Sequence, residues 1–122
     1  MLFCFDVDGT LLTDKMDGEG QYVKGMIPTS ILTKLEIKGH KVVIVSPSPF
    51  RPDGFKVFAE YGSNEFRWKN IESAMDYYGI TKDQTVYVDD LKSNVQQIRD
   101  YGIPFVYSPE AFMIYFEMKQ YI

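Results

Sequence analysis

Four short apolar runs along the chain have the length and composition of buried β-strands. They cover residues 2–7, 41–45, 85–88 and 104–107, and four β-branched residues make 41–45 the clearest of them. Apolar side chains recur at helical spacing between and after these runs, which predicts helices over residues 28–38, 69–78, 91–101 and 109–121. This alternation predicts a three-layer α/β fold, in which helices cover both faces of a mainly parallel, Rossmann-like sheet.

The length of 122 residues suits a single domain, 1–122, with one hydrophobic core. Residues 13–26 carry three glycines and mixed charges without apolar periodicity, so a long loop or a small β-flap is expected there. Residues 53–67 fit a helix and a strand equally well, and both assignments stay open.

Polar side chains follow three of the predicted strands at the point where each strand ends. They are Asp6 with Asp8, Ser46, and Asp89 with Asp90. Because ligands of parallel α/β sheets bind at the carboxyl ends of the strands, these groups are expected to converge. Clustered carboxylates repel one another unless a hard cation lies among them, and Mg²⁺ prefers such oxygen ligands. Helix capping explains any single aspartate equally well, but the whole set favours a metal site.

Composition narrows the possible functions further. Thirteen basic and seventeen acidic residues give a net charge of −4, which argues against general attraction to nucleic acid or to anionic membranes. The single cysteine, Cys4, and the single histidine, His40, exclude an intrachain disulfide and metal sites built on several such residues. No run reaches the length of a membrane span and no secretion signal is recognisable, so a soluble, cytoplasmic protein is expected.

The strand-end residues carry a family resemblance. DVDGTLLT at 6–13, Ser46 after VVIV, Lys69, and VYVDDLKSN at 86–94 follow one another in the order and spacing of four sequence signatures. In these motifs the chain resembles the haloacid dehalogenase (HAD) superfamily of hydrolases over residues 2–107. The first motif is specific, whereas the second and third are single residues whose order is informative. The resemblance implies an HAD-like fold and a Mg²⁺-dependent phosphatase.

The resemblance also implies a role for each acidic residue. Asp6 would be the nucleophile that forms an aspartyl-phosphate, and Asp8 would be the general acid and base. The metal would be bound by Asp6, by Asp8 through its backbone carbonyl, and by Asp90 with Asp89 beside it. Asp89 departs from the family pattern, which often has glycine at this position. Asn94 stands where the family often has a second aspartate, which removes one negative charge from the metal site.

Two further residues complete the implied machinery. Ser46 would donate a hydrogen bond to a phosphoryl oxygen, with Ser48 as the alternative. Lys69 would neutralise charge on the phosphoryl group and the nucleophile, with Arg67 as the competing cation.

The spacing of the motifs bears on the substrate. The gaps contain 37 residues from Asp8 to Ser46 and 22 from Ser46 to Lys69, too few for a cap domain of about 50 residues beside the sheet elements. A capless phosphatase suits large or end-presented phosphates, such as a phosphoprotein, a phosphorylated nucleic-acid end or a lipid-linked sugar. Otherwise a second subunit of a homo-oligomer would close the site.

Two other interpretations have different consequences. A binding or regulatory module with the same fold would bind the metal without useful turnover, and Asp8→Asn would then leave its function unchanged. A receiver-type phosphoacceptor domain would need an aspartate at the end of a middle strand and a lysine after the last strand. Ser46 and the absence of a lysine directly after residue 107 argue against it.

Overall fold

The structure is a computed structural model that describes residues 1–12 and 25–120. Its main sheet has parallel strands in the order β5-β4-β1-β6-β7. The strands are β1 Leu2–Phe5, β4 Lys41–Ile44, β5 Lys56–Val57, β6 Thr85–Val88 and β7 Phe105–Tyr107. Four of them match the apolar runs of the sequence. The edge strand β5 lies in the segment whose pattern left helix and strand open.

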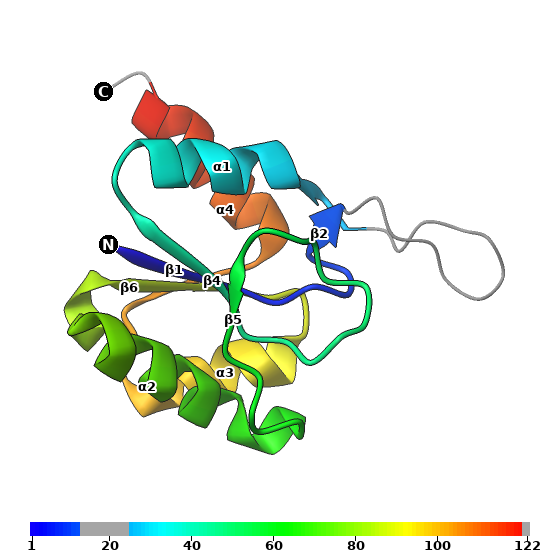
Figure 1. Cartoon of the computed structure of the whole chain (residues 1–122), viewed down its shortest axis with the longest axis vertical. Coiled ribbons are helices and arrows are strands. Elements are labelled where there is room, and N and C mark those ends of the chain that lie inside the picture. The colour runs from blue at the N-terminus through cyan, green and yellow to red at the C-terminus, as the bar shows by residue number, and fades with distance from the viewer. Residues whose placement is uncertain (13–24, 121–122) are drawn as a thin grey trace, which may run out of the picture.

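Helices form one layer on each face of this sheet (Figure 1). The helices α1 and α4 cover one face, and α2 and α3 cover the other. Their bounds are α1 Thr29–Ile37, α2 Arg67–Tyr78, α3 Lys92–Tyr101 and α4 Pro109–Gln120, with short 3-10 turns η1 Asn64–Phe66 and η2 Lys82–Gln84. The predicted three-layer, Rossmann-like fold is confirmed. Within the described residues, no helix has both the length and the apolar character needed to cross a membrane.

Strand β1 is apolar throughout because successive side chains point to opposite faces of a covered sheet. Phe3 and Phe5 pack in the core beneath α1 and α4, whereas Leu2 and Cys4 pack in the core beneath α2 and α3. All four residues are at most 2% exposed. Packing on both faces fixes the strand, and with it the position of Asp6, the next residue of the chain.

A second, two-stranded parallel sheet joins β2, Leu11–Leu12, to β3, Ile27–Pro28. The flap predicted for residues 13–26 lies outside the described residues, except for Gly25 and Met26. Residues 45–66, all of them described, contain only β5 and η1 between β4 and α2. The second gap therefore holds no folded cap, in agreement with its length.

The strand order places the ends of β1 and β6 at a switch point of the sheet. From the central strand β1 the chain moves to β4 and β5 on one side, and then crosses to β6 and β7 on the other. In open α/β sheets the crevice at such a point is where ligands bind. The residues that follow these two strands are Asp6, Asp89 and Asp90.

Candidate active site

The sheet register sets Asp6 and Asp89 side by side. Phe5 of β1 pairs with Val88 of β6, so the next residues along the two strands are Asp6 and Asp89. The backbone N–H of Asp6 donates to the Val88 carbonyl at 3.0 Å, which continues the ladder beyond β1. Asp6 and Asp89 are only 6% and 1% exposed. Two acidic side chains are therefore buried together at the end of the sheet.

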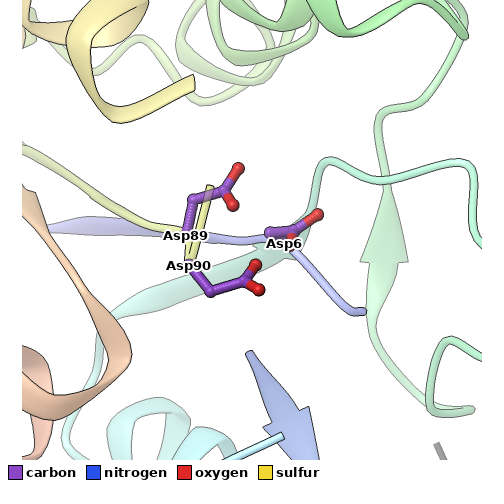
Figure 2. A group of neighbouring side chains, drawn as sticks. All are labelled: Asp6, Asp89 and Asp90. Atoms are coloured by element: carbon purple, nitrogen blue, oxygen red, sulfur yellow. The ribbon is translucent and has the colours of Figure 1, made fainter. Parts of the chain in front are cut away.

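Asp90 completes a group of three carboxylates (Figure 2). Each of Asp6, Asp89 and Asp90 offers an oxygen atom, and the three atoms all lie within 4.8 Å of one another. Opposite ligands of a Mg²⁺ ion lie about 4.2 Å apart, so the spacing of these oxygens is of the size that one cation requires. The carboxyl oxygens predicted from the strand ends are thus brought together. The Asp8 carboxylate is not part of this group.

A tight turn after β1 places Asp90 against the first motif. Gly9 has φ +77°, and a Cβ atom there would lie 2.0 Å from Oδ2 of Asp90. The hydroxyl of Thr10, which is fully buried, lies 3.2 Å from Oδ2 of Asp6 and 3.4 Å from Oδ1 of Asp90. The same oxygen accepts a hydrogen bond from the Asp90 N–H at 3.2 Å. Thr10 therefore links the two aspartates that come from different strands.

Arg67 is the cation that contacts the acidic group. Its Nη1 donates to Oδ1 of Asp6 at 3.0 Å and lies 3.9 Å from Oδ2 of Asp89. Its Nη2 donates to Oδ1 of Asn64 at 3.1 Å. Arg67 is 3% exposed although it is the first residue of α2. A buried arginine needs such partners, because the loss of its hydration is otherwise uncompensated.

Asp89 is held from inside the protein. Its Oδ1 accepts the Leu91 N–H at 2.8 Å, and its Oδ2 accepts Nδ2 of Asn94 at 2.8 Å. The hydroxyl of Tyr87 also donates to Oδ2 of Asp89. Burial, together with the negative charge of Asp89, raises the pKa of Tyr87 well above its usual value, so the hydroxyl remains a donor. Asn94 thus orients a neighbouring acid, one of the roles open to an amide at this position.

The segment that follows β4 supplies two serines to the site. Ser48 donates from its hydroxyl to Oδ1 of Asp8 at 2.9 Å, and its own N–H donates to Oγ of Ser46 at 3.2 Å. Both serines are buried. The loop after β4 therefore fixes the direction of the Asp8 carboxylate, and Ser46 lies next to this contact.

These groups line one cavity of about 420 Å³ at the carboxyl end of the sheet. Its lining comprises Asp6, Asp8, Ser46, Pro47, Ser48, Pro49, Asn64, Arg67, Asp89, Asp90, Leu91 and Asn94. All of the predicted site residues except Lys69 are among them. Among the described lining residues Arg67 is the only basic one.

The placement expected of Lys69 is corrected by the structure. Its ammonium group lies 5.0 Å from the ring centroids of Tyr61 and Phe66 and 5.5 Å from that of Trp68, outside the cavity lining. Residues two positions apart on a helix point in different directions, about 200° apart. Because Arg67 faces the end of the sheet, Lys69 faces away from it. Arg67, the competing cation, therefore occupies the position that was expected of Lys69.

Burial and crowding change the proton affinities of the acidic group. Burial raises the pKa of Asp6 to about 7, the charge of Asp89 acts in the same direction, and Arg67 opposes both. Burial and the charge of Asp89 also raise the pKa of Asp90. Between about pH 4 and pH 7 the metal-free folded protein therefore binds a proton at Asp6 that the unfolded chain would release.

This gives a pH-dependent stability that can be measured on the metal-free protein. The folded-state pKa of Asp6 lies above its ordinary value of 3.8. Its contribution to stability is therefore complete below about pH 4, and is lost as the pH rises to about 7. Chemical denaturation in a chelator, from pH 4 to 8, should show Asp6→Asn gaining stability over wild type by a few kcal/mol at most. A difference that does not vary with pH would contradict the raised pKa.

Three contributors were not assigned from the sequence. Thr10 lies within the first motif, and its residue type alone indicated neither of its aspartate contacts. Tyr87 belongs to an apolar strand, where a buried aromatic residue is ordinary core. Asn64 falls in the segment of open secondary structure. The contact of Tyr87 with Asp89 could have been found from the sequence. Tyr87 lies two residues before Asp89, and residues two apart in a strand point to the same face.

Comparison with protein-family models and with curated proteins gave no match. Among solved structures, the chain is similar to a hypothetical protein from Xanthomonas campestris, with a TM-score of 0.56 and 19% sequence identity. The match covers 88% of this chain and 62% of that one, so the chain spans less than two thirds of the length of its structural relative. At this identity the likeness concerns the fold alone, and it supports a Rossmann-like α/β domain with a mostly parallel sheet.

Proposed function

We propose that this protein is a Mg²⁺-dependent phosphatase of the HAD type, which hydrolyses a phosphate monoester through an aspartyl-phosphate on Asp6. The main support is one arrangement: Asp6 contacts Arg67 and shares its cavity with Asp8 and Asp90. A nucleophilic carboxylate, a cation for the phosphoryl group and a second acid are the parts that this reaction requires.

The donor set fits a magnesium ion. Asp6 and Asp90 would bind it, the Asp8 backbone carbonyl is the third ligand implied by the family, and Asp89 lies within the same group. A bound Mg²⁺ neutralises charge on the phosphoryl oxygens and orients the phosphate toward the nucleophile. Asp89 already accepts three hydrogen bonds inside the protein, so Asp90 is the better candidate for direct binding.

In the first step a carboxylate oxygen of Asp6 attacks phosphorus, and the bond from phosphorus to the leaving oxygen breaks. That oxygen keeps the electron pair and takes a proton from Asp8, whose direction Ser48 fixes. Arg67 stays on the nucleophile and can follow the phosphoryl charge as it develops.

In the second step water attacks the phosphorus of the aspartyl-phosphate. Asp8, now ionised, takes the proton from this water. The bond between phosphorus and Asp6 breaks, its electron pair returns to the carboxylate, and inorganic phosphate leaves. The two carboxyl groups are then back in their starting states.

The charges of the cavity lining favour a substrate with a single phosphate group. Its described lining contains Arg67 as the only basic residue against four aspartates, so a second phosphate would find no further basic side chain there. The gap after Ser46 holds no folded cap, which favours a large or end-presented phosphate or a partner subunit as a lid. The buried free thiol of Cys4 suits a reducing compartment, so we propose a cytoplasmic location.

The function is tested by phosphate release from an aryl phosphate with Mg²⁺ or with a chelator. We expect turnover only with Mg²⁺. In Asp8→Asn the aryl leaving group needs little protonation, but the attack of water loses its base, so the phosphorylated protein should accumulate and be visible by mass spectrometry. Asp76→Asn, on the exposed side of α2, serves as the control. Wild-type protein that binds Mg²⁺ but releases no phosphate would instead support the non-catalytic module.

The turn at Gly9 gives a separate prediction for the metal. Gly9→Ala should weaken Mg²⁺ binding, because the new Cβ displaces the Asp90 carboxylate, and should cost about 1–3 kcal/mol of stability from the strained φ. Gly39 is a matched control, since it has φ +93° with no atom within 4 Å of its Cβ position. Gly39→Ala should lose stability but retain Mg²⁺ affinity by calorimetry. Equal Mg²⁺ affinity in the two variants would contradict the close approach of Asp90.

A further inference from the structure

Arg67 is held at the site by contacts on both of its terminal nitrogens. Besides Asp6, its Nη1 donates to the hydroxyl of Tyr87 at 3.4 Å. On the opposite side its Nη2 donates to Oδ1 of Asn64 at 3.1 Å. The guanidinium is planar and its nitrogens point in fixed directions, so contacts on both sides fix its rotation as well as its position.

Tyr87 is placed for this contact by its strand and by its core. It is fully buried on β6, and its ring packs with residues of α2 and α3. At the end of that ring the hydroxyl meets Arg67 and Asp89. It accepts from the cation and donates to the acid, so it connects the two without adding charge. Phenylalanine would fill the same apolar space, and the hydroxyl therefore needs an explanation beyond packing.

Asn64 is braced in turn by α3. Its backbone carbonyl accepts a hydrogen bond from Nε2 of Gln97 at 2.8 Å. Oε1 of the same Gln97 accepts the N–H of Trp68 at 3.0 Å, one of the free donors in the first turn of α2. Gln97 thereby joins η1 and the start of α2, the segment from which Arg67 projects. The side chain and its backbone are both fixed.

We propose that Tyr87 and Asn64 are positioning residues that hold Arg67 in the orientation needed on Asp6. This inference rests on the proposed phosphatase function for its effect on turnover. It goes beyond that function because neither residue belongs to the machinery implied by the family resemblance, and neither one touches the reacting atoms.

The physical reason is preorganisation. A cation stabilises developing phosphoryl charge most when it is already oriented, because no reorganisation is then needed during the reaction. An arginine released from one side can still pair with Asp6 but rotates away from the productive direction. The stabilisation by Arg67 is then lost mainly in the transition state, which lowers kcat more than it raises KM.

The kinetic test uses the full chain and an aryl phosphate with Mg²⁺. Tyr87→Phe and Asn64→Ala should each lower kcat about tenfold with KM changed less than about twofold. Tyr101→Phe removes a hydroxyl that donates to the exposed Glu72, away from the cavity lining, and should leave both constants unchanged. In an Arg67→Met background Asn64→Ala should cause no further loss, because the group that its side-chain oxygen holds is gone. Additive losses in that background would overturn the proposal.

A second readout does not depend on turnover. In the ¹⁵N-labelled protein the guanidinium protons of Arg67 should exchange slowly with solvent and be assignable by their loss in Arg67→Met. Tyr87→Phe and Asn64→Ala should accelerate that exchange, while the signals of Arg51 and Arg99 stay unchanged. Unchanged exchange of Arg67 in both variants overturns the positioning role.

The two readouts separate failure of the inference from failure of the function. If wild type releases no phosphate, the proposed function fails, and exchange at Arg67 still decides whether these residues hold it. If Tyr87→Phe does not fold, Asn64→Ala carries both tests, since Asn64 is exposed and its side-chain amide is not part of the core.

Discussion

Replacing Asp6 with asparagine is expected to reduce Mg²⁺-dependent phosphate release by at least about a thousandfold. The carboxamide has nearly the same shape, and its oxygen can still accept the hydrogen bond that Arg67 now donates to Oδ1 of Asp6. It cannot attack phosphorus, and it supplies a weaker ligand to a cation. The fold should be retained, because removing one of two buried acidic neighbours relieves repulsion.

The measurement is release from an aryl phosphate, with a trapped phosphoprotein as a second signal. Wild type should form an acid-stable phosphorylated species during turnover, and Asp6→Asn should form none. Asp76→Asn, exposed on α2, controls for the loss of an aspartate charge elsewhere. Full activity in Asp6→Asn would exclude the aspartyl-phosphate mechanism.

The second large effect is expected at Arg67, and it distinguishes two cations that lie two residues apart. Arg67→Met should lower phosphate release by about a hundredfold to a thousandfold, because the proposed reaction would lose its cation for the phosphoryl group. It should also destabilise the metal-free protein by up to about 3–5 kcal/mol, since Asp6 and Asp89 lose their buried partner. Protonation of Asp6 would reduce this cost at low pH.

Lys69→Met is the matched control for Arg67→Met. The Lys69 ammonium lies over the rings of Tyr61 and Phe66 rather than in the cavity. Its removal should therefore change activity less than about twofold and stability by about 1 kcal/mol or less. Loss of activity in Lys69→Met with retention in Arg67→Met would reverse the assignment.

The fold was predictable because its sheet is covered on both faces. Each buried strand then appears as a continuous apolar run, and the helices between them alternate with a different period. The edge strand β5, Lys56–Val57, was not predictable, since two residues are too short for a periodic signal. Its pairing with Val43 and Ile44 depends on tertiary contacts alone.

The site was predictable as far as strand ends determine it. Asp6 and Asp89 meet because parallel register carries strand ends to one edge. The cation was not determined, because the sequence placed the start of the helix at Lys69, whereas α2 begins at Arg67. A start at Lys69 leaves Arg67 outside the helix, whereas in α2 Arg67 lies one turn before the buried Ile71 and therefore on the same face. Which of the two cations faces the sheet therefore required the structure.

The small sheet of β2 and β3 has a consequence for how this scaffold can be elaborated. Leu11 pairs with Ile27, and the carbonyl of Thr10 accepts the N–H groups of both Met26 and Ile27, at 3.1 and 3.0 Å. The two described segments that flank residues 13–24 are thus joined to each other beside the aspartates. Lengthening a loop whose ends are already joined costs little entropy, about 0.6 kcal/mol for each doubling. A longer insertion between residues 12 and 25 should therefore be tolerated without moving Asp6 and Asp90.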